Sequence, residues 1–582
     1  MDKKFAIINR DKIMKKKLNI LGVANANVSG AALIIGDKTV SAISEERLSR
    51  KKNDRCFPIN SINYVLSNSN LDISDIDFIC CGCWKGLDVP EYVETVVKDA
   101  ITYFKNDPAS EKIVIDKIRV SAERDEFFKN ELVDGLTNMG FDSSKIFMYD
   151  HHTSHAYTAF YASQFEESLV FTLDGRGDFK SGTVWLASRD SGLQLIDSIN
   201  MLDSLGVFYG YITKFLGFKP NRHEGKILGL AARGNYETVL PIVSRMINYE
   251  NGRLIGKIGD NFTAWNTGSI PSIENELKTH SREDIAAATQ YWLEELTLKY
   301  ITPIVQKYNI KNISLAGGVF ANVVLNQRLI EIDGVENIYV FPHMGDGGNA
   351  LGGAMIKAVE EGVNLEYPMK DAYLGPSFDN SEIESVLEKH SKELYYENVS
   401  NQKMKLAAEL IHEGKIVGWF QGRMEYGPRA LGTRSILARA TDSSINDSLN
   451  NRLSRTEFMP FAPVTMKEHA KAYYIDWKPE HFCSNFMTIT YNCTDLAKSK
   501  TPATVHVDGT ARPQIIDKGT NPEYYGVVEE YYKISGIPSI INTSFNNHEE
   551  PILCKPEDAV RSILLRNVDV MFIGDFLVKV NE

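Results

Sequence analysis

The chain contains 582 residues, of which 43% are hydrophobic and 24% are charged, a composition typical of a protein that is globular throughout. This length is too great for one hydrophobic core and predicts two to four domains. A formal net charge of −12 argues against nonspecific binding to nucleic acids or to anionic membranes, although a local basic pocket could still hold a small anion.

The start of the chain carries its only basic run, Lys15 to Lys17, ahead of the first apolar segment. Residues 1–17 are expected to form an N-terminal extension, with Met14 as an alternative start, because this stretch lacks the apolar segment of a secretory signal. The sequence contains no apolar run of about eighteen residues, which is the length that would predict a membrane span. A soluble cytoplasmic protein is therefore expected.

Seven cysteines over this length do not predict a disulfide framework. Cys80, Cys81 and Cys83 crowd one apolar segment and could form a thiolate metal site, but no second cysteine pair follows at zinc-site spacing. Buried small hydrophobic residues are the favoured interpretation, and no chemistry is assigned to them.

Two similar units of strands are predicted in the first half of the chain. Apolar segments at 19–23, 31–35 and 39–43 predict three strands joined by short polar turns, and a second such unit covers 168–173 and 182–186. Each unit has a polar or acidic hairpin tip. Repetition of this kind favours a duplicated core.

A later strand, 313–316, ends in Gly317-Gly318 and leads into a predicted helix at Val319. Backbone N–H groups at such a helix start can approach a phosphate or an adenosine. Two hairpins followed by strand, glycines and helix form the layout of the actin, sugar-kinase and Hsp70 ATPase superfamily. The sequence therefore predicts a duplicated α/β core that binds a nucleotide.

The most informative segment is 150–155, in which His151 and His155 stand four residues apart at the start of a predicted helix. Residues at i and i+4 share a helix face, so the two imidazoles are expected to converge. Asp174 ends a strand beside glycines and could add a carboxylate, which predicts a divalent-metal site. The alternative is a polar helix start whose histidines only cap or pack.

Two further loops in this half contain charged residues. The segment 217–226, which includes Glu224 and Lys226, is predicted to be a loop that leads into a helix. Asp346 lies in a glycine-rich loop at another helix start, where it could be a metal ligand or a simple N-cap.

A new pattern begins near residue 403, with a predicted helix, the strand 416–420 and a loop in which Arg423, Arg429 and Arg434 alternate with glycines. Guanidinium groups bind phosphate in a bidentate manner, and glycines let the backbone come close. The loop predicts a site for an oxyanion-rich ligand, with surface salt bridges and turns as the alternative. Further cationic and polar groups follow at Arg455, Arg512, Asn542, Ser544 and Asn546.

Taken in chain order, these motifs resemble those of the O-carbamoyltransferase family, which includes nodulation-factor and antibiotic carbamoyltransferases. The matching segments run in family order from about residue 19 to 578, at 45–50, 151–156, 174–177, 224–226, 316–319, 345–346, 422–437, 460–463, 508–514 and 542–546. A full ordered set is much more specific than any one motif.

The resemblance implies two α/β domains. Residues 18–376 are similar to the domain that transfers threonylcarbamoyl groups to tRNA, on the actin-like fold, and residues 377–582 are similar to YrdC-type domains. In such enzymes carbamoyl phosphate and ATP, with Mg(II), give carbamoyladenylate and pyrophosphate. A hydroxyl of a small natural product or sugar then takes the carbamoyl group, and AMP leaves. No nucleic acid or membrane partner is expected, and a homodimer is compatible with the sequence.

The resemblance also implies roles for individual residues. His151, His155, Asp174 and Asp346 would bind the metal, which is iron(II) by family expectation, although manganese(II) and zinc(II) also suit this ligand set. The groups expected to grip carbamoyl phosphate and ATP are Arg423, Arg429, Arg434, Arg455, Arg512, Asn542, Ser544 and Asn546. The groups expected to hold a nucleotide in the transfer domain are Gly175, Gly177, Gly317, Gly318 and Asn322.

Two residues are candidates for a direct catalytic role. Lys226 is a candidate because it is the lysine of the Glu-Gly-Lys segment that matches the family. His152 lies beside the metal ligands and is interpreted as an orienting group or a proton acceptor, with an ordinary residue at a helix start as the alternative.

Three segments depart from the family pattern. The first hairpin tip, usually His-Asp, is 25–29 here and contains neither residue, so the choice of acceptor is in doubt. The family's Lys-x-Arg-Glu appears as 453–456 and retains only Arg455, so the lysine's phosphate contact is absent or supplied elsewhere. The usual Arg-Gly-Glu-Pro appears as 548–551, His-Glu-Glu-Pro.

Other functions remain as alternatives. An actin-fold kinase would produce ADP, and the histidine helix and arginine-rich loops disfavour it. A tRNA-modifying transferase is disfavoured by the acidic charge, and a hydrogenase-maturation role by the lack of paired CxxC motifs. A noncatalytic, ATP-switched scaffold would bind nucleotide without consuming carbamoyl phosphate.

Overall fold

The computed structural model of the protein describes residues 17–88, 90–103, 108–257, 261, 268–455 and 458–581. The predicted N-terminal extension, with Met14, lies outside the described residues except for Lys17, and so does Thr456 of the segment that departs from the family pattern. Among the described helices, none combines the length and the apolar character needed to cross a bilayer.

The first sheet starts with an antiparallel meander of β1 (Asn19–Ala24), β2 (Gly30–Ile35) and β3 (Lys38–Ser44). β4 (Phe78–Cys81) and β5 (Ile146–Met148) continue it in parallel with β1, which gives the order β3-β2-β1-β4-β5. β1 and β2 are almost wholly buried, as their continuous apolar sequences require.

The second sheet repeats this design. β6 (Glu167–Gly177), β7 (Lys180–Ser188) and β8 (Gly192–Asn200) form the meander, and β11 (Asn312–Ala316) and β12 (Asn337–Val340) run parallel to β6. The order β12-β11-β6-β7-β8 is that of the first sheet, with the same pattern of parallel and antiparallel pairs. The duplicated, actin-like α/β core predicted from the sequence is confirmed.

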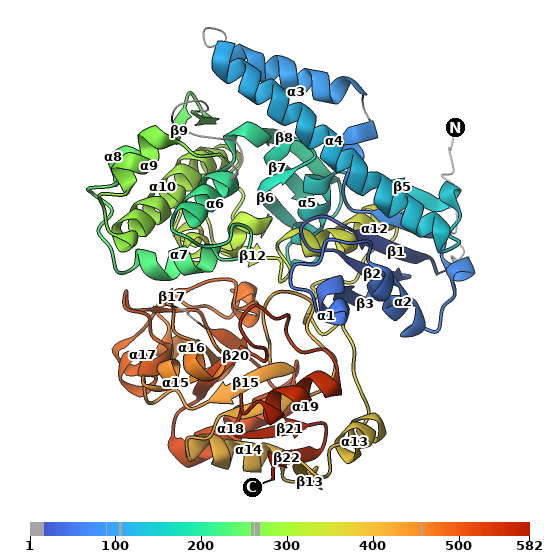
Figure 1. Cartoon of the computed structure of the whole chain (residues 1–582), viewed down its shortest axis with the longest axis vertical. Helices are drawn as coiled ribbons and strands as arrows, with labels where there is room; N and C mark the ends of the chain where they lie inside the picture. Colours follow the sequence, from blue (N-terminus) through green and yellow to red (C-terminus); the bar gives the residue numbers. More distant parts are fainter. Residues whose placement is uncertain are drawn as a thin grey trace, which may run out of the picture.

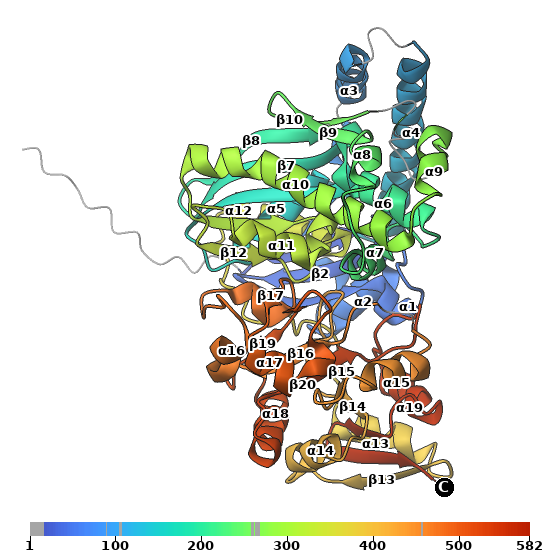
Figure 2. The same ribbon diagram turned by 90° about the vertical axis from the view of Figure 1, so that its left-hand side faces the viewer.

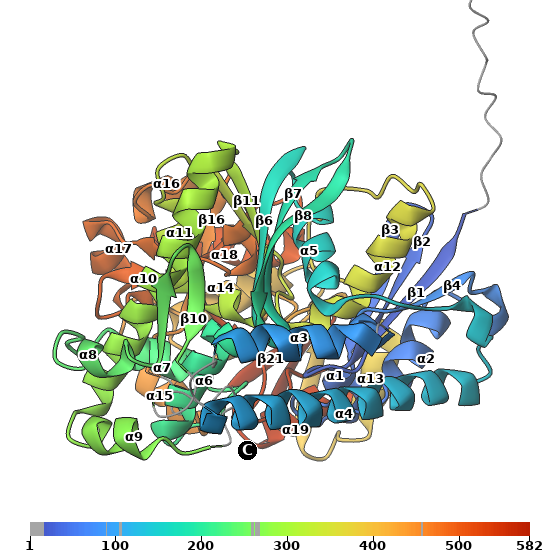
Figure 3. The ribbon, with the colours of Figure 1, turned by 90° about the horizontal axis from the view of Figure 1, so that it is seen from above.

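Two helices separate the sheets (Figure 3). α5 (His151–Tyr161) packs on β6 and β11, α12 (Asn349–Glu360) packs on β1, β2 and β4, and the helices pack against each other. Gly352 allows this close approach, because a Cβ atom there would lie 2.2 Å from the Ser154 carbonyl oxygen. The start of α5 and the turn before α12 are thus brought side by side.

The remaining elements of this half surround the core. α4 lies along one side beside α3, α6 packs on β6 of the second sheet, and α10 packs against α6 and α7 (Figure 1). The bounds are α1 (Glu45–Ser49), α2 (Ile59–Ser67), α3 (Pro90–Tyr103), α4 (Pro108–Asn138), α6 (Leu205–Phe215), α7 (Glu224–Ala231), α8 (Leu240–Val243), β9 (Ile247–Glu250), β10 (Arg253–Gly256), α9 (Pro271–Leu277), α10 (Arg282–Tyr308) and α11 (Val323–Ile330).

Two local predictions in this half need correction. The residues after Gly317 form a 3₁₀ turn, Gly318–Ala321, and the α-helix starts only at Val323, where the Asn322 side chain caps it by accepting the Leu325 N–H. Glu224 and Lys226 lie in α7 instead of in the loop before it.

The C-terminal half is built on one mixed sheet. Its order is β13 (Leu394–Asn398), β22 (Phe576–Val580), β21 (Val570–Ile573), β14 (Val417–Phe420), β15 (Arg434–Ala438), β20 (Ser539–Ser544), β16 (Ala462–Met466) and β19 (Gln514–Ile516). α14 (Lys403–His412) and α18 (Pro522–Ser535) cover one face, while α13 (Asn380–Glu388) and α19 (Pro556–Leu564) cover the other. The other elements are α15 (Ile445–Arg452), α16 (Lys467–Tyr473), β17 (Tyr491–Asn492), α17 (Asp495–Lys500) and β18 (Thr510–Ala511).

The two halves meet along an extended junction, and α7 lies on the side of the N-terminal half that faces the C-terminal half (Figures 1 and 2). The Arg423 guanidinium donates to the carbonyl oxygens of Val40 and Leu374 at 2.9 and 2.7 Å. Arg47 donates to the Gly427 carbonyl at 2.8 Å. Apolar residues of the C-terminal half also join the core of the first sheet, so the halves are fastened together rather than loosely linked.

Asp203, at the end of the 3₁₀ turn Met201–Asp203, predicts a measurable pH dependence of stability. Burial raises the pKa of its carboxyl to about 7, despite a hydrogen bond from the Gly256 N–H. In the unfolded chain the pKa of this carboxyl is near 3.8, so between about pH 4 and 7 the folded state binds the proton more tightly than the unfolded state does. The free energy of unfolding therefore falls as pH rises from about 4 to 7 and stays low above pH 7. We expect Asp203→Asn to unfold less readily at pH 8, by on the order of 2 kcal/mol, with no gain at pH 4. Urea denaturation at both pH values measures this; equal gains at both would contradict it.

Candidate functional site

α5 carries the two histidines predicted to bind a metal. Its N-cap is Asp150, whose carboxylate accepts the Thr153 N–H at 2.8 Å and fixes the helix start. His151 and His155 then project from one face, one turn apart, and both are buried. The predicted helix and its i, i+4 histidine pair are confirmed.

Asp174, near the end of β6, and Asp346, in the turn before α12, meet these histidines. Nε2 of His151 lies 3.3 Å from Asp174 Oδ2 and 3.5 Å from Asp346 Oδ1. Nε2 of His155 lies 3.2 and 3.8 Å from the same two oxygens. The four ligand atoms all lie within 4.8 Å of one another, so residues from distant parts of the chain surround one point.

Backbone hydrogen bonds hold both carboxylates in place. Asp174 Oδ1 accepts the Gly175 N–H at 2.7 Å, and Asp346 Oδ2 accepts the Asn27 N–H at 2.9 Å. In each case the other oxygen faces the histidines. Asn27 belongs to the first hairpin tip, so the segment that departs from the family pattern lies directly at this cluster.

Asn349, which sequence reasoning missed, is placed to orient His151. Its side-chain nitrogen lies 3.3 Å from His151 Nδ1, while its amide oxygen is buried with no hydrogen-bond partner. Turning the amide satisfies that oxygen, because it then accepts the Nδ1–H and leaves Nε2 for a metal. A ligand set of two imidazoles and two carboxylates, a few ångströms apart, fits iron(II), manganese(II) or zinc(II).

The electrostatics of the cluster also suit a cation. Burial opposes protonation of His151, but the carboxylates of Asp346 and Asp174 raise its pKa to about 9. Burial would raise the pKa of Asp174, yet hydrogen bonds from the two histidines hold this pKa well below the usual range. Without a metal the cluster therefore retains a proton on His151, whose place a divalent cation can take.

His152 does not belong to this cluster. Its Nδ1 lies 2.8 Å from the Thr172 hydroxyl, and its Nε2 lies 3.1 Å from the Lys180 carbonyl oxygen, which Nε2–H must donate to. Burial and the neighbouring His151 lower its pKa to about 3. Both ring nitrogens are engaged with the second sheet, so the imidazole anchors α5 to β6 and β7, an arrangement that does not favour the predicted proton-acceptor role.

We expect His152→Ala to destabilise the fold without emptying the metal cluster. Loss of two buried hydrogen bonds should lower the free energy of unfolding by roughly 1–3 kcal/mol. Urea denaturation measures the first effect, and elemental analysis of iron-reconstituted protein measures the second. A variant of unchanged stability that transfers the carbamoyl group far more slowly would restore a chemical role for His152.

A cavity of about 420 Å³ opens beside the cluster and is bordered by both carboxylates, Asp174 and Asp346. Of the residues predicted to hold a nucleotide here, Gly175, Gly318 and Asn322 line it. Gly177 and Gly317 do not line it and act through close packing: a Cβ atom would meet the His151 ring at Gly177 and the Leu173 carbonyl at Gly317. His343, Leu205, Tyr209 and Leu293 also line the cavity and were not predicted.

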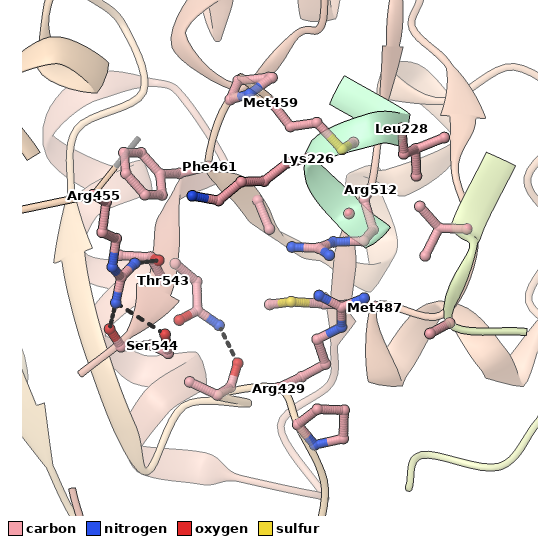
Figure 4. Close-up of a pocket in the computed structure, with 18 of the residues that line it drawn as sticks. Lys226, Leu228, Arg429, Arg455, Met459, Phe461, Met487, Arg512, Thr543 and Ser544 are labelled. Atoms are coloured by element: carbon pink, nitrogen blue, oxygen red, sulfur yellow. Dashed lines mark hydrogen bonds between the residues drawn. The ribbon is translucent and has the colours of Figure 1, made fainter. Parts of the chain in front are cut away.

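A second cavity, of about 310 Å³, lies between the two halves (Figure 4). Three of the predicted arginines, Arg429, Arg455 and Arg512, border it. Lys226 enters from α7 of the other half, and Figure 4 shows its side chain pointing toward the space between Arg455 and Arg512. The predicted polar groups Asn542, Ser544 and Asn546 complete this wall.

Arg455 organises one side of the second cavity. Its guanidinium donates to the Thr543 hydroxyl at 2.9 Å, to the Ser544 carbonyl at 2.7 Å and to the Asn546 carbonyl at 2.7 Å. It thereby fixes the end of β20 and the following loop. The arginine retained from the family motif is thus tied to the two polar residues predicted to act with it.

Arg423 and Arg434 do not line the second cavity, which corrects their predicted role as anion-binding residues. Arg423 holds the domain junction as described above. Arg434 is fully buried, donates to the carbonyl oxygens of Gln421 and Pro376 at 2.8 and 3.0 Å, and stacks 3.7 Å above the Phe420 ring. Both guanidinium groups bind backbone carbonyl oxygens: those of Arg423 belong to the junction segments, and those of Arg434 belong mainly to the loop that precedes it.

The two cavities share part of their walls. Lys52, Arg222 and Arg429 border both, together with Gly225, Leu228, Ala321 and Pro428. Sequence reasoning missed Lys52 and Arg222, because both lie in segments without a recognisable anion-binding pattern. The cation-rich cavity and the metal-type cluster are therefore neighbouring parts of one site.

An actin-like lobe with a metal-type cluster, joined to a cation-rich cavity, has the features of an enzyme that transfers a group from an anionic donor. The family models for the carbamoyltransferase N-terminus and C-terminus match residues 19–355 and 408–580. The chain belongs to the carbamoyltransferase family, as the motifs indicated.

Relatives from several organisms match most of the chain. Nodulation protein NolNO of Sinorhizobium fredii is 32% identical over 94% of this chain and 78% of its own length. An uncharacterised protein of Methanocaldococcus jannaschii is 33% identical over 93% of this chain and 96% of its own length.

Solved structures resemble the chain more distantly. HypF of T. kodakarensis aligns with a TM-score of 0.30 at 15% identity, over 60% of this chain and 48% of HypF. The activator of 2-hydroxyisocaproyl-CoA dehydratase from Clostridium difficile, with bound ADPNP, aligns with a TM-score of 0.33 at 12% identity, over 60% of this chain and 99% of the activator.

Proposed function

We propose that the protein is an ATP-dependent O-carbamoyltransferase that uses carbamoyl phosphate as donor and a hydroxyl of a small natural product or sugar as acceptor. The observation that carries this proposal is a pair of adjoining cavities with different chemistry. One is lined by cations from both halves of the chain, and the other borders four side chains of a metal-binding type. Two chemically distinct half-reactions suit such a pair.

The cation-rich cavity suits the formation of the activated carbamoyl group. Carbamoyl phosphate and water give carbamate and phosphate; a carbamate oxygen then attacks the α-phosphorus of ATP, supplied with Mg(II), and pyrophosphate leaves. The products are carbamoyladenylate, pyrophosphate and phosphate. Arg429, Arg512 and Lys226 would balance the charge of the phosphates, and Arg455 would hold Ser544 and Asn546 against them.

The second cavity suits the transfer step. The acceptor hydroxyl attacks the carbamoyl carbon, the bond to the adenylate oxygen breaks, and AMP and a proton are released. His151, His155, Asp174 and Asp346 would hold the divalent ion, which when bound supplies Lewis-acid stabilisation of the charge that develops in this step. Gly175, Gly318 and Asn322 would border the adenylate, and Asn27 would keep Asp346 in position.

The proposal is tested by incubating the protein with ATP, Mg(II), carbamoyl phosphate and iron(II), without an acceptor. We expect pyrophosphate and phosphate in equal amounts, formed only when both substrates are present, and carbamate esters by mass spectrometry when hydroxylated compounds are added. A kinase would instead release ADP. Nucleotide binding without any pyrophosphate would refute the proposal and favour the scaffold alternative.

A further inference from the structure

A second cluster of possible metal ligands lies apart from the one described above. It consists of His223, just before α7, and His548 and Glu549, in the loop after β20; among the described residues it is the other group of this kind. The three ligand atoms lie within 4.8 Å of one another. They come from both halves of the chain and line the cation-rich cavity.

The geometry centres on one oxygen of Glu549. Its Oε1 lies 2.8 Å from His223 Nε2 and 3.7 Å from His548 Nε2. The two imidazole rings are nearly parallel, with centroids 5.9 Å apart. Two imidazole nitrogens and one carboxylate oxygen therefore face a common point, which is the ligand set of many three-residue zinc sites.

The cations near Glu549 occupy its other oxygen. Lys219 Nζ and Arg222 Nη2 lie 2.9 and 3.1 Å from Oε2. They orient the carboxylate without standing between Oε1 and the imidazoles, much as outer partners orient ligands in known metal sites. A metal would displace the proton shared by His223 and Glu549. The proton of His223 would then lie on Nδ1, so the weak 3.3 Å hydrogen bond from the Lys219 N–H to Nδ1 would break.

Glu549 adopts a backbone conformation that side chains rarely occupy. Its φ is +64°, in the left-handed region where glycine is usual, and the family pattern departs at this same segment. A strained residue that persists at such a position suggests a function for its side chain. The side chains of His223, His548 and Glu549 retain 12%, 27% and 31% exposure, so a cation can reach them from solvent.

We infer that His223, His548 and Glu549 form a second divalent-cation site, of the zinc type, that fastens the two halves of the chain to each other beside the cation-rich cavity. The imidazoles favour zinc(II) or a similar transition metal over magnesium, which prefers oxygen ligands. Its fourth position is left for water or for an anion in the cavity.

The test isolates this site by using the full-length His155→Gln variant, in which the first cluster is impaired. Zinc(II) is titrated against a chromophoric chelator, without nucleotide or turnover. We expect two equivalents bound by the wild type, one by His155→Gln, and none by His155→Gln combined with His548→Gln. His390→Gln, which alters a partly exposed histidine elsewhere, serves as the matched control and should keep both equivalents.

Thermal denaturation provides a second measurement. Because zinc binds the folded state, it should raise the Tm of His155→Gln but not that of the variant that also carries His548→Gln. Zinc binding and a zinc-dependent rise in Tm that both survive His223→Gln and His548→Gln together would overturn the inference. Because this outcome concerns only the second cluster, this proposal and the proposed function can fail independently.

Discussion

Asp174→Asn should stop carbamoyl transfer and leave pyrophosphate release nearly unchanged. The substitution keeps the shape of the side chain but removes the charge that faces His151 and His155 at 3.3 and 3.2 Å. Loss of a metal that stabilises charge in the transfer step should reduce carbamate formation by about a hundredfold or more. In the proposed function pyrophosphate forms in the other cavity, which Asp174 does not line.

The measurement follows both products in the same reaction, with carbamoyl phosphate, ATP and one accepted hydroxyl compound. Asp442→Asn is the matched control, because Asp442 is half exposed, lies 3.6 Å from Arg439 and accepts the Ser444 N–H at 2.9 Å, a hydrogen bond that the amide oxygen of asparagine can keep. A metal chelator applied to the wild type should reproduce the Asp174→Asn result. Equal loss of both products would mean that the two cavities do not divide the chemistry as proposed.

Much of the transfer lobe could be predicted because its signals are local. The two meanders appear in the sequence as apolar strands with polar turns, and the His151–His155 spacing is diagnostic of one helix face. Their convergence with Asp346 could not be derived from spacing, since it depends on α12 packing against α5 through Gly352. The motif order of the family supplied that link.

The failures arose where burial decides the role of a polar residue. Arg429 lies in the glycine-rich loop and Arg434 begins β15 directly after it, yet Arg434 is wholly enclosed among carbonyl oxygens while Arg429 lines the cavities. His152 and His155 are both buried, but their rings face opposite neighbours. A single sequence records residue type and spacing, and neither reveals which side of a loop meets a cavity.

Arg512→Met should have the opposite effect: it should slow pyrophosphate release and spare the transfer step. Of the two cavities Arg512 lines only the cation-rich one, which Lys226 also borders, so its loss should weaken the proposed binding of the phosphates while the metal-type cluster remains intact. Each hydrogen bond from a guanidinium to a charged group contributes about 1.5–3 kcal/mol, so loss of a bidentate contact should slow pyrophosphate release by at least about a hundredfold.

Synthetic carbamoyladenylate makes this prediction decisive. Supplied to Arg512→Met, it bypasses the first half-reaction and should be converted to the carbamate ester at nearly the wild-type rate. Arg439→Met, which removes a half-exposed arginine of the same half, should leave both steps unchanged. If Arg512→Met fails with the synthetic intermediate as well, the arginine serves the transfer step too, because the shared wall of Lys52, Arg222 and Arg429 would then join the cavities into one functional unit.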